Sequence, residues 1–333
     1  MIIIAEAGVN HNGSMNYAKK LVDIASASGA DIIKFQTFKT SELVSKQVLK
    51  AKYQKSQKYT NETQFQMLKK LEISKKFHYE LIKYCEIKKI EFLSTAFDIE
   101  SLKFLLKLGI KRIKVPSGEI TNYPLLEFIG KVNKKTILST GISSINEIKE
   151  ACKILYKSGL NKKNLTILHC TSEYPAPFTE INLNCISSLK NKFNTNVGYS
   201  DHTLGIEASI AAVAVGANLI EKHITLNKSL EGPDHKSSIE KDELNELVRS
   251  IKNISIGMGD GIKKASKSEL KNKKIIRKFI VAKSEIEIGQ IFTNKNLTTK
   301  RTGRGMSAIL WPKVIGKKSK RKYYKDDIIK VLC

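Results

Sequence analysis

The chain has 333 residues, of which 41% are hydrophobic, and it carries a formal net charge of +26. This length suits one large domain together with a small one, and the absence of any run of 18 apolar residues excludes a membrane-spanning helix. The first strand is predicted to begin at Ile2, which leaves no room for a signal peptide. Five cysteines without a CxxC pair are typical of reduced thiols, so we expect a cytoplasmic protein.

The positive charge is concentrated near the end of the chain, where residues 262–333 contain 21 Lys and Arg against five Asp and Glu. Such a surface could attract anionic partners, including phosphate-bearing substrates or nucleic acid. A solvated, lysine-rich surface explains it better, because the basic cluster at 317–322 has no interleaved aromatic residues and no nucleic-acid-binding motif occurs. We therefore expect neither nucleic acid nor a membrane among the partners.

Short β-rich runs alternate with longer segments of helical periodicity over the first 260 residues. Amphipathic helices are predicted at 17–28, 101–108, 145–158 and 206–215. This alternation favours an α/β fold of the closed (β/α)₈ TIM-barrel type over a doubly wound open sheet, which normally has fewer strands and a GxGxxG phosphate-binding motif. The eight predicted strands are Ile2–Ala7, Asp31–Phe35, Glu91–Thr95, Arg112–Val115, Thr136–Ser139, Leu165–His169, Asn196–Ser200 and Leu219–His223.

Polar segments follow several of these strands, as the catalytic face of a barrel requires. Residues 8–14 follow the first strand, 116–119 the fourth and 140–141 the fifth. The connection after the second strand is unusually long, because its polar residues continue to about residue 62. A connection of this length often forms a lid, and a partly ordered surface insertion is equally compatible with it.

The barrel pattern ends at a glycine-rich stretch, residues 257–261. We assign residues 1–260 to the barrel, 261–276 to a basic linker and 277–333 to a small domain with short strands near 279–282 and 296–299. A unit of that size is marginally stable alone. It is therefore expected to dock on its own barrel or on a second subunit.

Two histidines end neighbouring predicted strands, His202 in residues 199–203 (YSDHT) and His223 in residues 221–223 (EKH). Because parallel strands end at one edge, the two imidazoles are predicted to lie close enough to share a divalent metal, with water or substrate completing the coordination. The alternative is two ordinary histidines that cap strand ends. His78 is expected to be solvated on a polar helix.

Two lysines near strand ends could serve an anion. Lys34 and Gln36 share one face of their strand, which is predicted to be the barrel interior, and Lys114 lies near the end of the fourth strand. A buried charge requires a partner. One interpretation is therefore a structural ion pair of Lys34 with Glu6 or Glu119.

The other interpretation is a cradle for a phosphate or carboxylate group. Serines at other strand ends would complete it, namely Ser117, Ser139 and Ser172. A lysine that forms a Schiff base is the lesser option. Carboxylates at similar depth, on Glu6, Glu119 and Asp234, could move a proton or bind sugar hydroxyls, and the pattern does not rank them. His11 and His235 lie in loops from which they could reach a substrate.

Six separated motifs occur in order: AEAGVNHNG at 5–13, KFQT at 34–37, PSGE at 116–119, YSDHT at 199–203, EKH at 221–223 and GPDH at 232–235. On these motifs the chain resembles the sialic acid synthase family, which includes N-acetylneuraminate synthases and N,N'-diacetyllegionaminate synthases. The resemblance runs nearly end to end. The tail, through residues 299–303 (TKRTG), resembles the antifreeze-like (SAF) domain that closes these enzymes.

The resemblance implies a cytosolic transferase that condenses phosphoenolpyruvate with the open-chain form of an N-acylated mannose-type sugar. The products would be a nine-carbon 2-keto sugar acid and phosphate. Members of the family depend on a divalent metal, typically Mn²⁺ or Mg²⁺. They form domain-swapped homodimers in which the small domain of one subunit covers the barrel mouth of the other.

The resemblance also implies roles for individual residues. The expected metal ligands are His202 and His223, and Arg301 would reach in from the partner subunit. Glu119 is expected to transfer a proton. The phosphoenolpyruvate site would contain Lys34, Lys114, Ser117, Ser139 and Ser172, with Thr95 nearby. The sugar side would contain Glu6, Gln36, Tyr174 and Asp234.

The sugar itself distinguishes two readings of the resemblance. N-acetylmannosamine would give N-acetylneuraminate, and this is the main prediction. The sugar 2,4-diacetamido-2,4,6-trideoxymannose would give N,N'-diacetyllegionaminate, and this is the alternative. A basic nucleic-acid-binding protein is the alternative from a different class; it would predict nucleic-acid retention with steep salt dependence.

Overall fold

The computed structural model describes residues 1–50 and 62–330. The chain divides into two compact units, Met1–Gly259 and Asp260–Cys333, each with its own hydrophobic core. None of the helices in these described ranges has both the length and the apolar character needed to cross a membrane.

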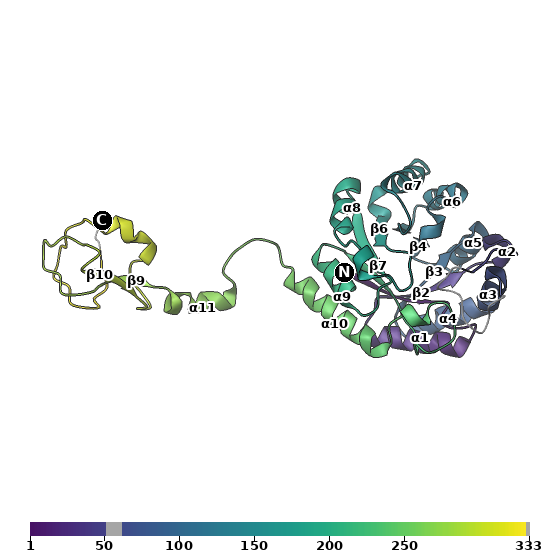
Figure 1. Cartoon of the computed structure of the whole chain (residues 1–333), viewed down its shortest axis with the longest axis horizontal. Coiled ribbons are helices and arrows are strands. Elements are labelled where there is room, and N and C mark those ends of the chain that lie inside the picture. The colour runs from purple at the N-terminus through teal and green to yellow at the C-terminus, as the bar shows by residue number, and fades with distance from the viewer. Residues whose placement is uncertain (51–61, 331–333) are drawn as a thin grey trace. The chain divides into compact units, whose positions relative to one another are not determined.

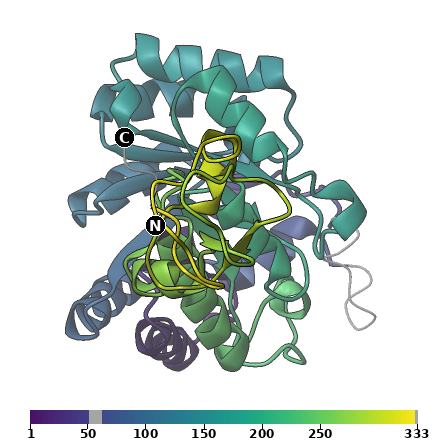
Figure 2. The same ribbon diagram turned by 90° about the vertical axis from the view of Figure 1, so that its left-hand side faces the viewer.

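The first unit is built on an eight-stranded parallel sheet, and its helices surround the strands (Figures 1 and 2). The hydrogen-bonded order is β3-β2-β1-β8-β7-β6-β5-β4, and the two ends of this order, β3 and β4, also contact each other. The sheet therefore curls into a near-closed (β/α)₈ barrel, which confirms the predicted fold. Its strands are β1 Ile2–Gly8, β2 Ile32–Thr37, β3 Glu91–Ala96, β4 Arg112–Val115, β5 Lys135–Ser139, β6 Leu165–Cys170, β7 Asn196–Asp201 and β8 Leu219–His223.

The helices pack their apolar faces on the outside of the strands, where the main core lies. Several begin at side chains that accept a hydrogen bond from the first helical turn, as Ser14, Ser74, Asp98 and Ser144 do. The helices of this unit are α1 Met15–Ser28, α2 Thr40–Leu43, α3 Gln64–Leu71, α4 Lys75–Ile87, α5 Ile99–Lys107, α6 Tyr123–Val132, α7 Ile145–Lys157, α8 Cys185–Phe193, α9 Glu207–Ala214 and α10 Lys241–Gly257.

The interior of the barrel is layered, because alternate residues of each strand point inward. The lower layer is apolar and consists of Ile4, Ile32, Leu93, Ile137, Leu168 and Leu219. Two residues further along the strands, the inward positions become polar and include Glu6, Lys34, Thr95, Lys114, Ser139, Ser200 and Glu221, all of them buried. An apolar floor therefore lies beneath a charged layer at the carboxyl ends of the strands.

Gly198 in β7 shows how closely this floor is packed. A Cβ atom at this position would lie 2.4 Å from the carbonyl oxygen of Leu219 and 2.7 Å from a methyl carbon of Leu168. Any larger residue would have to push two strands apart, so the absence of a side chain lets the floor close at this point.

The long connection after β2 contains α2 and α3. Residues 51–61 of the predicted excursion lie outside the described residues. The prediction of a lid or insertion can be compared with the structure only in the residues before and after them. There, Phe38, Met67 and Leu71 form a small core with Val9 of the β1–α1 loop. The connection therefore packs on the barrel mouth.

The second unit contains α11 Lys267–Ile276 and an antiparallel pair, β9 Phe279–Ala282 and β10 Leu297–Lys300. A 3₁₀ helix at Ala308–Lys313 and several isolated bridges complete it. Its core gathers Ile280, Ala282, Ile286, Phe292, Leu297, Val314, Tyr323 and Ile329. The two short strands were predicted, whereas α11 lies in the stretch expected to be a linker; the identification of this unit as an antifreeze-like domain stays a prediction.

Candidate active site

A cavity of about 500 Å³ opens at the carboxyl ends of the barrel strands. This is the face on which barrel enzymes carry their active sites. Its lining includes twelve of the fourteen site residues predicted from the sequence: Glu6, Lys34, Gln36, Thr95, Lys114, Ser117, Ser139, Ser172, Tyr174, His202, His223 and Asp234. Their roles stay predictions, but the structure brings them together.

A buried ionic network forms the base of the cavity. The Nζ of Lys34 lies 2.9 Å from Oε1 of Glu6 and 3.5 Å from Oε2 of Glu221, and it donates a hydrogen bond of 3.2 Å to Thr95. Lys114 lies 3.5 Å from the other oxygen of Glu221. The structural ion pair considered for Lys34 thus exists with Glu6, not with Glu119. Lys34 and Glu6 also line the cavity, so the ion pair and a site position occur together.

The network has unequal effects on its two carboxylates. Burial raises the pKa of Glu6 to about 7, even though Lys34 lies beside it. Burial acts in the same direction on Glu221, but Lys114 and Lys34 together outweigh it and hold the pKa of Glu221 down at about 2. At neutral pH, Glu221 is therefore a fixed negative charge, while Glu6 can take up or release a proton.

Hydroxyl groups gather beside Lys114. Its Nζ donates a hydrogen bond of 2.6 Å to Ser139, and the Oγ of Ser117 accepts one of 2.9 Å from the backbone of Gly141. A Cβ atom on Gly141 would lie 2.0 Å from the Oγ of Ser172 and 2.9 Å from that of Ser117. The glycine therefore leaves room for both serines to approach one point, as an anion site with several donors requires.

The two predicted metal ligands lie side by side, with 5.6 Å between the centroids of their rings. The Nδ1 of His202 is 2.7 Å from the carbonyl oxygen of Thr171, and an N–H donated there leaves a lone pair on Nε2, which lies 3.4 Å from the hydroxyl of Ser200. The Nδ1 of His223 is buried and has no hydrogen-bond partner. Burial, with His202 and Lys34 nearby, lowers the pKa of His223 well below its usual value, so its ring is neutral.

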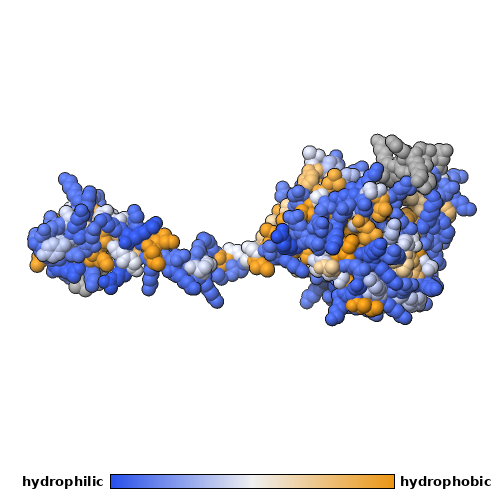
Figure 3. Space-filling model, turned by 90° about the horizontal axis from the view of Figure 1, so that it is seen from below, coloured by the Kyte–Doolittle hydropathy of each residue, from blue (hydrophilic) through white to orange (hydrophobic). Residues whose placement is uncertain are grey.

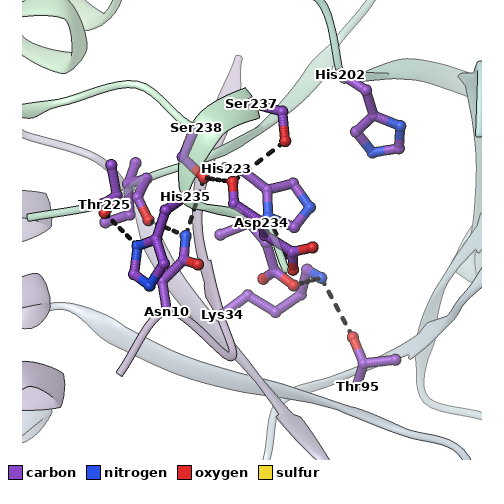
Figure 4. A network of polar contacts seen from close by, with 12 residues as sticks. Asn10, Lys34, Thr95, His202, His223, Thr225, Asp234, His235, Ser237 and Ser238 are labelled. Atoms are coloured by element: carbon purple, nitrogen blue, oxygen red, sulfur yellow. Dashed lines mark hydrogen bonds and ion pairs between the residues drawn. The ribbon is translucent and has the colours of Figure 1, made fainter. Parts of the chain in front are cut away.

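Tyr174 and Asp234 border this pair of histidines. The ring of Tyr174 stacks on His202 with 4.0 Å between centroids. An oxygen of Asp234 lies 3.9 Å from the Nδ1 of His223, too far for a hydrogen bond. Burial raises the pKa of Asp234 to about 6. Figure 4 shows the carboxylate of Asp234 and the amine of Lys34 near the ring of His223.

Asp234 lies in the loop after β8, and buried hydrogen bonds connect this loop to the loop after β1 (Figure 4). The side-chain amide of Asn10 donates to the carbonyl oxygen of Ile224 at 2.8 Å and to Ser238 at 2.9 Å, and Ser238 in turn donates to the carbonyl oxygen of Asp234 at 2.7 Å. His235 bridges Thr225 and Asn12. The position of Asp234 is therefore set by a chain of hydrogen bonds that begins in another loop.

Two predicted site residues are not in this group. Glu119 does not line the cavity, and its carboxylate accepts a hydrogen bond of 2.6 Å from the side chain of Asn122. Arg301 is exposed and lies in the second unit, directly after β10. Neither position tests the role proposed for it.

Three predictions about other histidines are wrong. His78 is 1% exposed, since it hydrogen-bonds to Thr37 and to the carbonyl oxygen of Ser74 in the core. His11 and His235, expected in loops that could reach a substrate, are fully buried and absent from the cavity lining. The ring of His11 accepts a hydrogen bond from the backbone of Gly13, and that of His235 joins Thr225 to Asn12 of the other loop, so both rings are held inside.

Glu221 was not predicted as a site residue, although it lines the cavity. Because Glu221 precedes His223 by two positions, strand alternation places both on the inner face. Cys170 and Ser200 also line the cavity. The same alternation, with His202 two positions after Ser200, could have found the serine.

Comparisons with known proteins agree on the relationship. The family model described as NeuB matches residues 21–263. The chain is 54% identical to N,N'-diacetyllegionaminic acid synthase of Campylobacter jejuni over 99% of its own length and 98% of the relative's, and 44% identical to the protein of the same name in Legionella pneumophila, over 94% and 89%.

A solved structure agrees with this relationship. The N-acetylneuraminic acid (sialic acid) synthetase of Leptospira borgpetersenii, solved in complex with citrate, superimposes with a TM-score of 0.73 at 35% identity. The match covers 82% of this chain and 90% of that one. With a barrel, a cavity and a full-length sequence match all in agreement, the chain belongs to the NeuB family.

Proposed function

We propose that this protein condenses phosphoenolpyruvate with 2,4-diacetamido-2,4,6-trideoxymannose to form N,N'-diacetyllegionaminate and phosphate. The observation that carries the proposal is the 54% identity, over nearly the whole of both chains, to the Campylobacter jejuni protein of that activity's name. This favours the alternative substrate of the sequence argument over its main prediction, N-acetylmannosamine.

The charges of the cavity suit phosphoenolpyruvate. Lys114, with Ser139 bonded to it and Ser117 and Ser172 in the same cavity, offers donors to the phosphate and carboxylate groups, and Lys34 adds a second buried ammonium. These donors are fixed by the barrel before substrate arrives, so they can stabilise the charge that develops as phosphate leaves. Lys34 and Lys114 are held by the carboxylates of the network, which reduces the cost of burying them.

The condensation balances with the groups present. The methylene carbon of phosphoenolpyruvate bonds to the aldehyde carbon of the open-chain sugar, and the aldehyde oxygen takes a proton. Water then adds to C2, and phosphate departs from the resulting tetrahedral centre. Glu6 and Asp234, whose raised pKa values lie at about 7 and about 6, are the carboxyl groups able to exchange protons near neutral pH.

The residues around the histidines fit a divalent metal of the Mn²⁺ or Mg²⁺ type. His202 keeps one ring nitrogen for ligation because its other nitrogen is committed to Thr171, and His223 carries a buried nitrogen without a partner. Among the described residues, no group of three or more His, Cys, Asp or Glu is arranged to hold a metal. Solvent or substrate oxygens would complete the shell, and a bound metal would polarise the aldehyde.

A direct experiment tests the proposal. Purified protein is incubated with phosphoenolpyruvate, Mn²⁺ and each of the two sugars; phosphate release is followed, and the product is identified by mass spectrometry. We expect N,N'-diacetyllegionaminate from the diacetamido sugar, with a higher kcat/KM than for N-acetylmannosamine. If neither acylated mannose releases phosphate with metal supplied, the proposal fails.

N-acetylneuraminate synthase remains the second candidate. The observation in its favour is the similarity to the Leptospira borgpetersenii sialic acid synthetase. A higher kcat/KM for N-acetylmannosamine in the same assay would select it.

A further inference from the structure

One stretch of the cavity lining is mainly apolar, although Gln64 lines the cavity from the same helix, α3. Its apolar members are Val9, Leu43, Val44, Met67, Leu68, Leu71 and Phe97, which we call the apolar wall. Met67 and Leu71 are anchored in a small core with Val9, while Leu43 and Leu68 are half-buried beside them. The wall is therefore a built surface whose half-buried members border the cavity.

The wall lies on the side of the barrel mouth away from the three serines, although the buried amine of Lys34 belongs to β2 on the same side. Ser117 and Ser172 follow β4 and β6, and Ser139 ends β5. His202 follows β7 and His223 ends β8, whereas the wall is formed by segments that follow β1, β2 and β3. Near Gly8 this side begins close to the histidines, since a Cβ there would lie 3.5 Å from His223 and 3.4 Å from Gln36.

This arrangement fixes the direction of the sugar if the proposed function holds. Its aldehyde carbon must lie by the histidines and within bonding reach of phosphoenolpyruvate, which takes the β4–β6 side. The far end of the sugar is then directed to the β1–β3 side, against the apolar wall. Against the aliphatic members of the wall, a hydroxyl group would lose its water without gaining a partner, whereas a methyl group would be buried favourably. Gln36 and Gln64 are the amide side chains that line the cavity on this side.

We propose that the apolar wall selects the 6-deoxy end of the sugar and so makes Leu43 and Leu68 specificity-determining residues. The inference rests on the proposed function and deepens it. It names the feature of the substrate that the cavity distinguishes, a methyl group where other acylated mannoses carry a hydroxymethyl group.

The test compares N-acetylmannosamine with its 6-deoxy analogue, since this pair differs at C6 alone. For the unmodified protein we expect kcat/KM to favour the 6-deoxy sugar by roughly 10- to 100-fold, the range in which an apolar pocket rejects an added hydroxyl. Leu43→Asn and Leu68→Asn should each reduce this preference by about tenfold while leaving the KM for phosphoenolpyruvate unchanged. Ile87→Asn is the matched control, because Ile87 is 73% exposed at the end of α4 and is not part of the cavity.

Different failures have different meanings in this design. If none of the acylated mannoses supports phosphate release, the proposed function is contradicted. Turnover of both sugars with equal kcat/KM, or an equal loss for both in the Leu43 and Leu68 variants, would overturn the role of the wall and leave the condensation intact. Melting temperatures of the variants show whether a loss for both sugars comes from unfolding.

Discussion

The two histidines of the cavity are held in different ways, and this determines what each can ligate. His202 is oriented by the Thr171 carbonyl, whereas His223 is kept neutral by burial and by the positive charges around it. A neutral ring with a free lone pair is the form that binds a metal. The residue that lacks a hydrogen-bond partner is thus the one most suited to gain a metal.

We predict that His202→Ala and His223→Ala each weaken Mn²⁺ binding by at least roughly 100-fold. Equilibrium dialysis with metal analysis measures this independently of turnover. His169→Gln is the control, because His169 binds the carbonyl of Ile181 and does not line the cavity. Unchanged dialysis results for both alanine variants would remove the histidines as ligands.

His11 gives a prediction about acid stability. Burial, with a smaller contribution from His78, lowers its pKa to about 4, whereas the unfolded chain would have the ordinary value of 6.5. Between these values the unfolded state binds the proton more readily, so His11 lowers stability as pH falls from 6.5 towards 4, with a slope of up to about 1.4 kcal/mol per pH unit. In urea unfolding across this range, His11→Asn should flatten the pH dependence relative to the unmodified protein; an unaltered slope would contradict it.

At the scale of elements, the loops after β1 and β8 act together through Asn10. Replacing it with alanine leaves the Ile224 carbonyl and Ser238 without their shared donor, which we expect to lower the free energy of unfolding by about 1–3 kcal/mol. Because Ser238 holds the backbone of Asp234, the KM for the sugar should rise several-fold while that for phosphoenolpyruvate stays constant.

Steady-state kinetics with each substrate varied in turn measure this difference for Asn10→Ala. Ser229→Ala, in an exposed part of the same loop, is the control. An equal rise in both KM values would mean that Asn10 supports the barrel mouth in general and does not position Asp234.

The strands of the barrel were predictable from sequence because each is a short apolar run between polar segments. All eight are present, and Arg112–Val115 and Leu219–His223 have the predicted bounds. Helix α11 was missed, since its exposed and basic residues give little hydrophobic periodicity. A capping box at Ser266 and Glu269 was its readable signal.

The inner face of the strands was also predictable in part. Alternation correctly placed Lys34 and Gln36 in the cavity. It could not reveal the state of each charge, because the pKa values of Glu6 and Glu221 depend on distances between strands that are far apart in the sequence. The apolar wall was unpredictable for a similar reason, since leucines in a polar excursion give no sign of which surface they will face.

At the scale of the whole molecule, the second unit carries Arg301 directly after β10. Its surface, like that of the barrel unit, is mainly hydrophilic on the face shown in Figure 3. If the unit closes the barrel of a partner subunit, as the family resemblance implies, Arg301 acts on a cavity in another chain.

Subunit mixing tests this arrangement. Arg301→Ala and Lys34→Ala are each expected to lose most of their activity. If one subunit's arginine serves the other's cavity, refolding the two variants together should restore up to about a quarter of normal turnover. About half of the dimers formed are heterodimers, and each heterodimer has one intact site out of two. Activity that stays at the level of the separate variants would indicate that Arg301 serves its own chain or none.

The apolar floor of the barrel has a kinetic consequence. Ile4, Ile32, Leu93, Ile137, Leu168 and Leu219 fill the barrel below the cavity, so both reactants of the proposed reaction would enter from the carboxyl ends of the strands. The lysines and Ser139 lie in the layer directly above this floor, deeper than the loop that carries Asp234. If the proposed function holds, the enol phosphate would bind first, and the sugar would then lie between it and the barrel mouth.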